Sequence, residues 1–327
     1  MPLLSILLLL AGFILLILGA DKLVEGASSL AKRYKIPEIV IGLTIVAFGT
    51  SAPELAINIV AAINGSTDIV LGNVLGSNIF NVLLILGVAA MINPLNVKKN
   101  TVKYEIPFSV VAAILLLLLT MDTWFGLGKN QLESRDGIIL LVFFGFFLYY
   151  NFLLVKSNPD EMEVHTKNLP LWKSLTFMAL GLAGLILGGR LIVDNAVKIA
   201  EILGISQRVI ALTIVSIGTS LPELATSIMA VRRKEADIAI GNVVGSNIFN
   251  IFLVLGSSIT IKNTWISDAS LTDIWVNIGV GLLLVGFVFR GGDRTAGKWQ
   301  GLTLDFWEGL AFVILYAGYL TYLVIQN

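Results

Sequence analysis

Cysteine is absent from this 327-residue chain, and histidine occurs once, as His165 in a polar stretch. Without cysteine there can be no disulfide bond, thiol nucleophile or thiolate metal site. One solvated histidine gives histidine-based catalysis or zinc binding nothing to build on. Charged residues are also scarce, at 13% against roughly 25% in a soluble domain, and the formal net charge is zero. We therefore expect no enzyme active site, no cofactor and no nucleic-acid partner.

The chain is instead rich in apolar residues, which make up 56% of it, and its mean hydropathy is +0.89. Its apolar runs are continuous, as in Ile6–Leu18, whereas barrel strands alternate over about ten residues. With about 20 residues for each span, the sequence predicts an all-α integral membrane protein with ten transmembrane helices. Their expected limits are 3–31, 37–63, 69–92, 104–121, 135–155, 171–200, 207–231, 237–261, 271–289 and 304–325.

The basic residues predict the orientation in the membrane. Most Lys and Arg residues fall in the loops after the odd-numbered helices, such as Lys32, Arg33 and Lys35 after the first and Arg232 and Arg233 after the seventh. Loops rich in Lys and Arg stay in the cytoplasm. We therefore expect a multi-pass protein of the cell inner (cytoplasmic) membrane, surrounded by the lipid bilayer, with both termini outside.

One stretch of the sequence occurs twice. Residues 36–81 and 205–250 align at a constant offset of 169 without a gap. The offset contains five spans, an odd number, so the two copies must cross the membrane in opposite directions. This predicts two inverted five-helix repeats, 1–160 and 170–327, joined by a short cytoplasmic linker at 156–170. Inverted repeats that share a site near the bilayer midplane are typical of transporters.

Each copy places a carboxylate inside a predicted helix, Glu54 in the first and Glu223 in the second. A carboxylate in hydrocarbon costs several kcal/mol, and no Lys or Arg lies at membrane depth in the predicted helices 37–63, 69–92, 207–231 and 237–261. Each acid must therefore bind a proton or a cation. Pro53 and Pro222 precede the two acids, and a proline inside a helix frees the carbonyl four residues back.

Further oxygen-bearing side chains accompany the acids at helical spacing. They are Thr50, Ser51, Asn73, Ser77 and Asn81 in the first copy and Thr219, Ser220, Asn242, Ser246 and Asn250 in the second. Hydroxyl, amide and carboxylate oxygens suit Na⁺ and Ca²⁺. Structural roles are also open for the neutral groups. Ser and Thr often bond the backbone one turn back, and Asn, including Asn78, can join helices.

Charged residues also occur in the two helices that open the repeats. Asp21, Lys22 and Glu25 lie towards the cytoplasmic end of the first, and Arg190 and Asp194 towards the outer end of the sixth. We expect these residues to anchor the helices at the membrane interfaces.

The runs GTSAPELA at 49–56 and GTSLPELA at 218–225, each followed by GSNIFN at 76–81 and 245–250, resemble the two alpha repeats of the cation/calcium exchanger superfamily. The chain looks most like the prokaryotic sodium/calcium exchanger branch. The resemblance implies ion ligands at Glu54, Glu223, Thr50, Thr219, Ser51, Ser220, Ser77, Ser246, Asn81 and Asn250, with backbone carbonyls near Ala47 and Ser216. Potassium-dependent relatives have Asp where Asn250 stands, so one formal charge fewer is expected here.

These observations predict a secondary active antiporter that exchanges Na⁺ for Ca²⁺ by alternating access and functions as a monomer. Ca²⁺/H⁺ antiport is an alternative, because the same carboxylates could be protonated in turn. A cation channel is a second alternative, which the inverted repeats disfavour.

Overall fold

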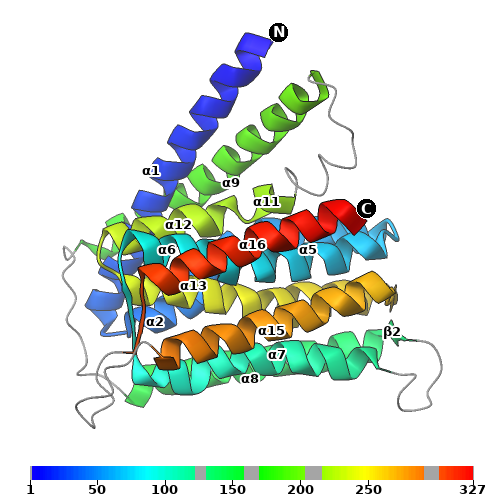
Figure 1. Cartoon of the computed structure of the whole chain (residues 1–327). Helices are drawn as coiled ribbons and strands as arrows, with labels where there is room; N and C mark the ends of the chain where they lie inside the picture. Colours follow the sequence, from blue (N-terminus) through cyan, green and yellow to red (C-terminus); the bar gives the residue numbers. More distant parts are fainter. Residues whose placement is uncertain (1, 122–129, 158–168, 203–215, 291–301, 327) are drawn as a thin grey trace.

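The computed structural model describes residues 2–121, 130–157, 169–202, 216–290 and 302–326, which are helical along most of their length (Figure 1). The first half contains α1 (Pro2–Tyr34), α2 (Glu38–Ile41), η1 (Gly42–Val46), α3 (Ala47–Thr50), α4 (Ala52–Ile63), α5 (Thr67–Phe80), η2 (Asn81–Leu86), α6 (Gly87–Ile92), β1 (Leu95–Val97), η3 (Thr101–Glu105), α7 (Ile106–Thr120), β2 (Gln131–Leu132) and α8 (Ser134–Ser157). The second half contains α9 (Leu171–Ile202), α11 (Ser216–Thr219), α12 (Leu221–Arg232), α13 (Ala236–Phe249), η5 (Asn250–Leu255), α14 (Gly256–Ile261), β3 (Thr264–Trp265), α15 (Asp268–Arg290), β4 (Leu302–Leu304) and α16 (Phe306–Gln326). The η segments are π-helical turns, and most continue the helices on either side.

The membrane prediction is confirmed. Within the described residues, eight helices are long and apolar enough to cross a bilayer, and the bent pair Glu38–Thr50 with Ala52–Ile63 makes a ninth. Their ends agree with the expected limits to within about three residues. The predicted span 207–231 is described only from Ser216, as α11 and α12, so its first part lies outside the described residues. So does most of the linker predicted at 156–170, including His165.

The two halves share one element order, offset by the length of the repeat. Adding 169 to the bounds of α1, α5 and η2 gives those of α9, α13 and η5 to within one residue. The last two pairs occupy the centre, where α13 and η5 are almost wholly buried and α8 and α16 lie at the periphery. A helix that is apolar all round is stable only when it is buried in this way or faces lipid.

α1 and α9 lie side by side and lean away from the other helices (Figure 1). They run antiparallel and touch through glycines. A Cβ on Gly12 would lie 2.9 Å from the carbonyl oxygen of Gly188, and one on Gly19 would lie 2.8 Å from that of Gly181. Small residues allow such close backbone approach, which is a main source of helix association in lipid. α1 and α9 therefore form one tightly packed pair.

Two short antiparallel ladders join the halves outside the helices, and the sequence did not predict them. β1 pairs with β4, with Leu95 opposite Leu304, and β2 pairs with β3, with Leu132 opposite Thr264. Each ladder satisfies backbone groups of a loop with a loop from the other half. The ladders therefore connect the repeats through loops beside the helix ends, where β1 also contacts α13 and β3 contacts α5.

Candidate ion-binding site

Both Gly-Thr-Ser-x-Pro-Glu runs lie at a break between two helices. Ser51 separates α3 from α4 with φ −82° and ψ 3°, and Ser220 separates α11 from α12 with φ −91° and ψ 7°. The segments on either side of Ser51 are bent by 47°. Pro53 and Pro222 fall in the first turn of the following helix, where a missing N–H costs little. The sequence placed both prolines inside a continuous helix, and the structure corrects this, because a new helix begins just before each of them.

The breaks bring the two acids into contact with the opposite repeat. The Ser51 hydroxyl donates to Oε1 of Glu223 over 3.1 Å, and the Ser220 hydroxyl donates to Oε1 of Glu54 over 3.3 Å. All four side chains are buried. Each carboxylate is thus held by a serine from the other half of the chain, and the prediction that the acids of both repeats share one location agrees with this geometry.

Two threonine–asparagine contacts also join the two repeats. The Thr50 hydroxyl donates to Oδ1 of Asn242 over 3.0 Å, and the Thr219 hydroxyl lies 3.4 Å from Oδ1 of Asn73. Thr50 also contacts the carbonyl of Val46 at 3.1 Å, one turn back. The helix-internal role that sequence reasoning left open for threonine is therefore present together with the contact between repeats.

Four asparagines join α5 and η2 to α13 and η5. The amide nitrogen of Asn78 donates to the backbone carbonyl of Asn247 over 3.2 Å, and Asn247 returns the bond over 3.4 Å. The amide nitrogen of Asn81 donates to Oδ1 of Asn247 and that of Asn250 to Oδ1 of Asn78, both over 3.0 Å. The interhelical role considered for Asn78 is confirmed. These bonds use the amide nitrogens of Asn81 and Asn250 and fix how the two amides are turned.

Several buried oxygens of this cluster have no hydrogen-bond partner among the described residues. They are Oε2 of Glu54, Oε2 of Glu223, Oδ1 of Asn81, Oδ1 of Asn250 and Oγ of Ser246. A buried oxygen without a partner is costly, and all of these except the serine hydroxyl can only accept. The partner that such a set fits is a hard cation, for which carboxylate and amide oxygens are suitable ligands.

Two of the other predicted ligands, Ser77 and Ala47, already have protein partners. The Ser77 hydroxyl lies 3.0 Å from the Ser220 hydroxyl, within hydrogen-bond distance. The Ala47 carbonyl accepts one from the backbone of Ser51 over 2.9 Å, in addition to a 3.3 Å contact with Thr50. Ser216 is the first residue of α11. Ion coordination by Ala47 and Ser216 remains a prediction from the family resemblance.

Sequence reasoning missed three buried polar residues one turn after the acids. Asn58 accepts from the amide of Asn73 over 2.7 Å, and Ser227 accepts from Asn242 over 3.0 Å. Thr226 is fully buried and its hydroxyl has no partner among the described residues. Asn58 and Ser227 follow Glu54 and Glu223 by four residues, a spacing that places them on the same helix face and could have identified them.

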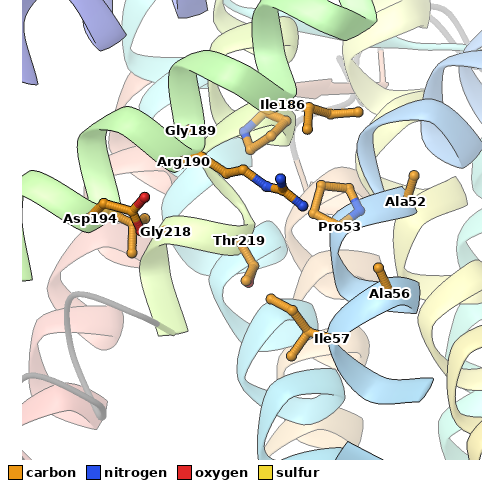
Figure 2. A pocket seen from close by; sticks show the side chains of 12 residues that line it. Ala52, Pro53, Ala56, Ile57, Ile186, Gly189, Arg190, Asp194, Gly218 and Thr219 are labelled. Atoms are coloured by element: carbon orange, nitrogen blue, oxygen red, sulfur yellow. The ribbon is translucent and has the colours of Figure 1, made fainter. Parts of the chain in front are cut away.

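A cavity of about 340 Å³ lies beside the cluster, between α9 and the two broken helices (Figure 2). Its walls are mostly small or apolar residues, together with two charged side chains from α9. The lining residues are Ala52, Pro53, Ala56, Ile57, Ile186, Gly189, Arg190, Val193, Asp194, Gly218, Thr219 and Pro222. Because Thr219 belongs to both the cavity and the polar cluster, the cavity reaches the edge of the candidate site.

Comparison with known proteins gives consistent relationships over nearly the full length. The family described as "Sodium/calcium exchanger protein" matches residues 4–153 and 173–325. The sodium/calcium exchanger MaX1 of Methanosarcina acetivorans is 32% identical, with 98% of each chain covered. The inner membrane protein YrbG of Escherichia coli is 40% identical over 78% of this chain and 79% of its own length.

A solved structure shares the fold. The chain is similar to the sodium-calcium exchanger NCX_Mj with a TM-score of 0.80 and 31% sequence identity, covering 97% of this chain and 98% of that one. This similarity agrees with the ten-helix inverted-repeat architecture predicted from the sequence.

Proposed function

The chain belongs to the sodium/calcium exchanger family, and from this premise we propose that it is a secondary active antiporter that moves Ca²⁺ in exchange for Na⁺. The observation that carries the proposal is the set of buried oxygens without partners around Glu54 and Glu223. Two carboxylates supply about two negative charges. One Ca²⁺ or several Na⁺ can neutralise them, so the two ions compete for one location.

The proposed ligands are the buried oxygens without partners and the oxygen-bearing groups that the family resemblance implies. Glu54 and Glu223 are the principal ligands, and the oxygens of Asn81, Asn250 and Ser246 complete the coordination. Further hydroxyls and carbonyls are proposed to coordinate one ion or the other. They are the hydroxyls of Thr50, Thr219, Ser51, Ser220 and Ser77 and the carbonyls of Ala47 and Ser216. A flexible set of six to eight oxygens suits Ca²⁺.

Exchange rather than leakage follows from the charge of this site. Without an ion, two carboxylates remain buried in a setting of low dielectric, which opposes a change of conformation. A bound cation of either kind removes that obstacle. The inverted repeats, assigned to 1–160 and 170–327, allow the two conformations to expose the site to opposite sides in turn. The transported ions are therefore the only ligands that the mechanism requires.

We place the protein in the cytoplasmic membrane with both termini outside, following the distribution of Lys and Arg. The bonds from Ser51, Ser220, Asn81 and Asn250 join the two repeats of one chain, which supports a site formed by a single copy. A single copy is sufficient for the proposed cycle.

Flux measurements on purified protein in liposomes test this proposal. With pH clamped by an ionophore, an outward Na⁺ gradient should drive uptake of radiolabelled Ca²⁺, and an equal K⁺ gradient should not. Uptake that requires a pH gradient instead would establish Ca²⁺/H⁺ antiport. Single-channel currents in a planar bilayer would establish a channel. Either result would replace the proposed function.

A further inference from the structure

The long helices α1 and α9 contact the broken helices differently, although the two helix pairs occupy equivalent positions in the repeats. The offset of 169 relates α1 to α9 and α12 to α4. α1 packs closely on α12. The corresponding region between α9 and α4 is occupied by the 340 Å³ cavity. One side of the molecule is therefore closed and the opposite side is open.

Equivalent positions confirm this difference quantitatively. Ile57 on α4 lines the cavity and is 38% exposed, whereas Thr226, at the equivalent place on α12, is 0% exposed. The two residues occupy the same position in their repeats, and the difference agrees with the close contact of α1 with α12 and the cavity between α9 and α4.

The closed side is held by an ionic cluster. Arg233, directly after α12, donates through Nε to Oδ1 of Asp21 over 3.0 Å and bonds the same oxygen through Nη2. Its Nη2 also lies 3.4 Å from Oε2 of Glu25, whose carboxylate accepts from Lys22 over 2.8 Å. One turn further, Ser28 donates to the carboxylate of Glu235. We call the Asp21–Glu25–Arg233 ion pairs the latch.

The latch occupies one helix face and joins two separate parts of the molecule. Asp21, Glu25 and Ser28 are spaced by four and three residues, so they lie on the same side of α1. Asp21, Glu25 and Arg233 are each only partly exposed. A pair shielded in this way from water and salt is worth more than an exposed one. The interfacial anchoring expected for Asp21 and Glu25 stays a prediction, and the structure adds that both bind Arg233, at the end of α12.

Among the described residues, the open side has no equivalent ion pair. The offset relates Asp21 to Arg190, Glu25 to Asp194 and Arg233 to the uncharged Asn64. Arg190 extends from α9 across the cavity towards Pro53 on α4, as Figure 2 shows. No ion pair links either α9 residue to α4 within the described part of the chain. The sequence itself therefore restricts the latch to one side.

We propose that the Asp21–Glu25–Arg233 latch sets the balance between the two open states, by holding the side that carries Arg233 closed. Because glycines pack α1 tightly on α9, separating α1 from α12 also shifts α9 relative to α4. Closure on one side is thus linked to opening on the other. The proposal rests on the proposed antiport function. It concerns the accessibility of each side of the protein to water and does not depend on which ions are exchanged.

Cysteine labelling tests the latch directly, because the native chain contains no cysteine. Thr226→Cys reports on the closed side and Ile57→Cys on the open side. Each is placed in the full-length chain in lipid nanodiscs, where a water-soluble maleimide reaches both faces. With the latch intact, the Ile57→Cys protein should react quickly and the Thr226→Cys protein slowly, because only a minor open population exposes position 226.

Arg233→Gln and Asp21→Asn should each accelerate labelling of the Thr226→Cys protein by about fivefold, the effect of losing a pair worth about 1 kcal/mol. The exchanged pair Asp21→Arg with Arg233→Asp should return the rate towards that of the intact latch. Arg232→Gln removes the same charge from the neighbouring exposed position and serves as the control.

An unchanged labelling rate at position 226 in Arg233→Gln and Asp21→Asn would overturn the latch, as would an equal acceleration in Arg232→Gln. Labelling requires no ion flux, so these outcomes are separate from those of the transport assay. Absence of Na⁺-driven Ca²⁺ uptake in the native protein would refute the proposed function and leave the labelling result standing.

Discussion

At the scale of single residues, Glu54 and Glu223 each have one oxygen bound by a serine of the other repeat and one without a partner. The bound oxygen orients the carboxylate, and the other is available to a cation. This division of roles explains how two acids can be tolerated in a buried position. Asp273 on α15 differs from these two acids, because its carboxylate accepts a hydrogen bond from Tyr319 over 2.9 Å and lies outside the cluster.

Glu54→Gln and Glu223→Gln should each reduce Ca²⁺ flux by at least about 100-fold, because even outer-shell changes at metal sites cost 10–100-fold. Neither variant should lose stability, since the amide removes a buried charge. Added Ca²⁺ should raise the thermal unfolding temperature of the native protein, because binding stabilises the folded state, and should not raise that of either variant. Radiolabelled flux and thermal unfolding measure both effects.

Asp273→Asn is the matched control, because it neutralises a membrane-helix carboxylate outside the cluster. Its flux and its response to Ca²⁺ should remain native. Native flux in Glu54→Gln or Glu223→Gln would remove that residue from the proposed site.

At the scale of helices, the breaks at Ser51 and Ser220 and the π-helical turns that begin at Asn81 and Asn250 occur at the same places in both halves. Such irregular turns are frequent at functional sites. Here they occur where helices of opposite repeats exchange side-chain hydrogen bonds. The long helices α1 and α9 are different, because they are regular and their contact depends on glycine.

Gly19→Leu should separate α1 from α9. A Cβ at this position would lie 2.8 Å from both the Gly181 carbonyl oxygen and the Leu185 nitrogen, which are backbone atoms and cannot rotate away. Overpacking of this kind costs about 1–3 kcal/mol. We expect a lower unfolding temperature and reduced flux, measured by thermal unfolding and by Ca²⁺ uptake.

Gly145→Leu provides the comparison, because position 145 on α8 is exposed and a Cβ there meets no atom within 4 Å. This variant should behave like the native protein. A native unfolding temperature and native flux in Gly19→Leu would contradict the close backbone packing of α1 on α9.

At the scale of the whole molecule, the inverted repeat produces a two-fold arrangement. The contacts at the site are symmetric, whereas the contacts of α1 and α9 with the broken helices are not. The crossed bonds from Ser51 and Ser220 are equivalent, whereas one side is latched and the other holds the cavity. An antiporter needs this combination, because the site must serve both sides while only one is open.

The proposed orientation predicts which loops an impermeant reagent can reach. The Asn64→Cys protein should be labelled by a membrane-impermeant maleimide in intact cells, and the Lys99→Cys protein should react only after the membrane is opened. Both positions are exposed at helix ends, and Lys-rich loops are retained in the cytoplasm. Labelling at position 99 but not at position 64 in intact cells would reverse the orientation.

Much of the fold and of the site could be predicted from the sequence. The helix limits follow from the length of apolar runs, because a bilayer requires about 20 apolar residues for each span. The pairing of Glu54 with Glu223 follows from the repeat. The helix breaks at Ser51 and Ser220 could not be located this way, because a proline is compatible both with a kink and with a new first turn.

The sequence by itself determined that the protein is a helical membrane protein, that it is duplicated and inverted, and that each half contributes one buried acid. These properties depend on composition, spacing and charge, which are local. The tertiary structure alone decided which oxygens lack partners, which residues fix the amides of Asn81 and Asn250, and that Arg233 pairs with Asp21 and Glu25. The bonds that fix the amides and close the latch join residues 166 to 212 positions apart in the chain, and no local pattern encodes contacts over such separations.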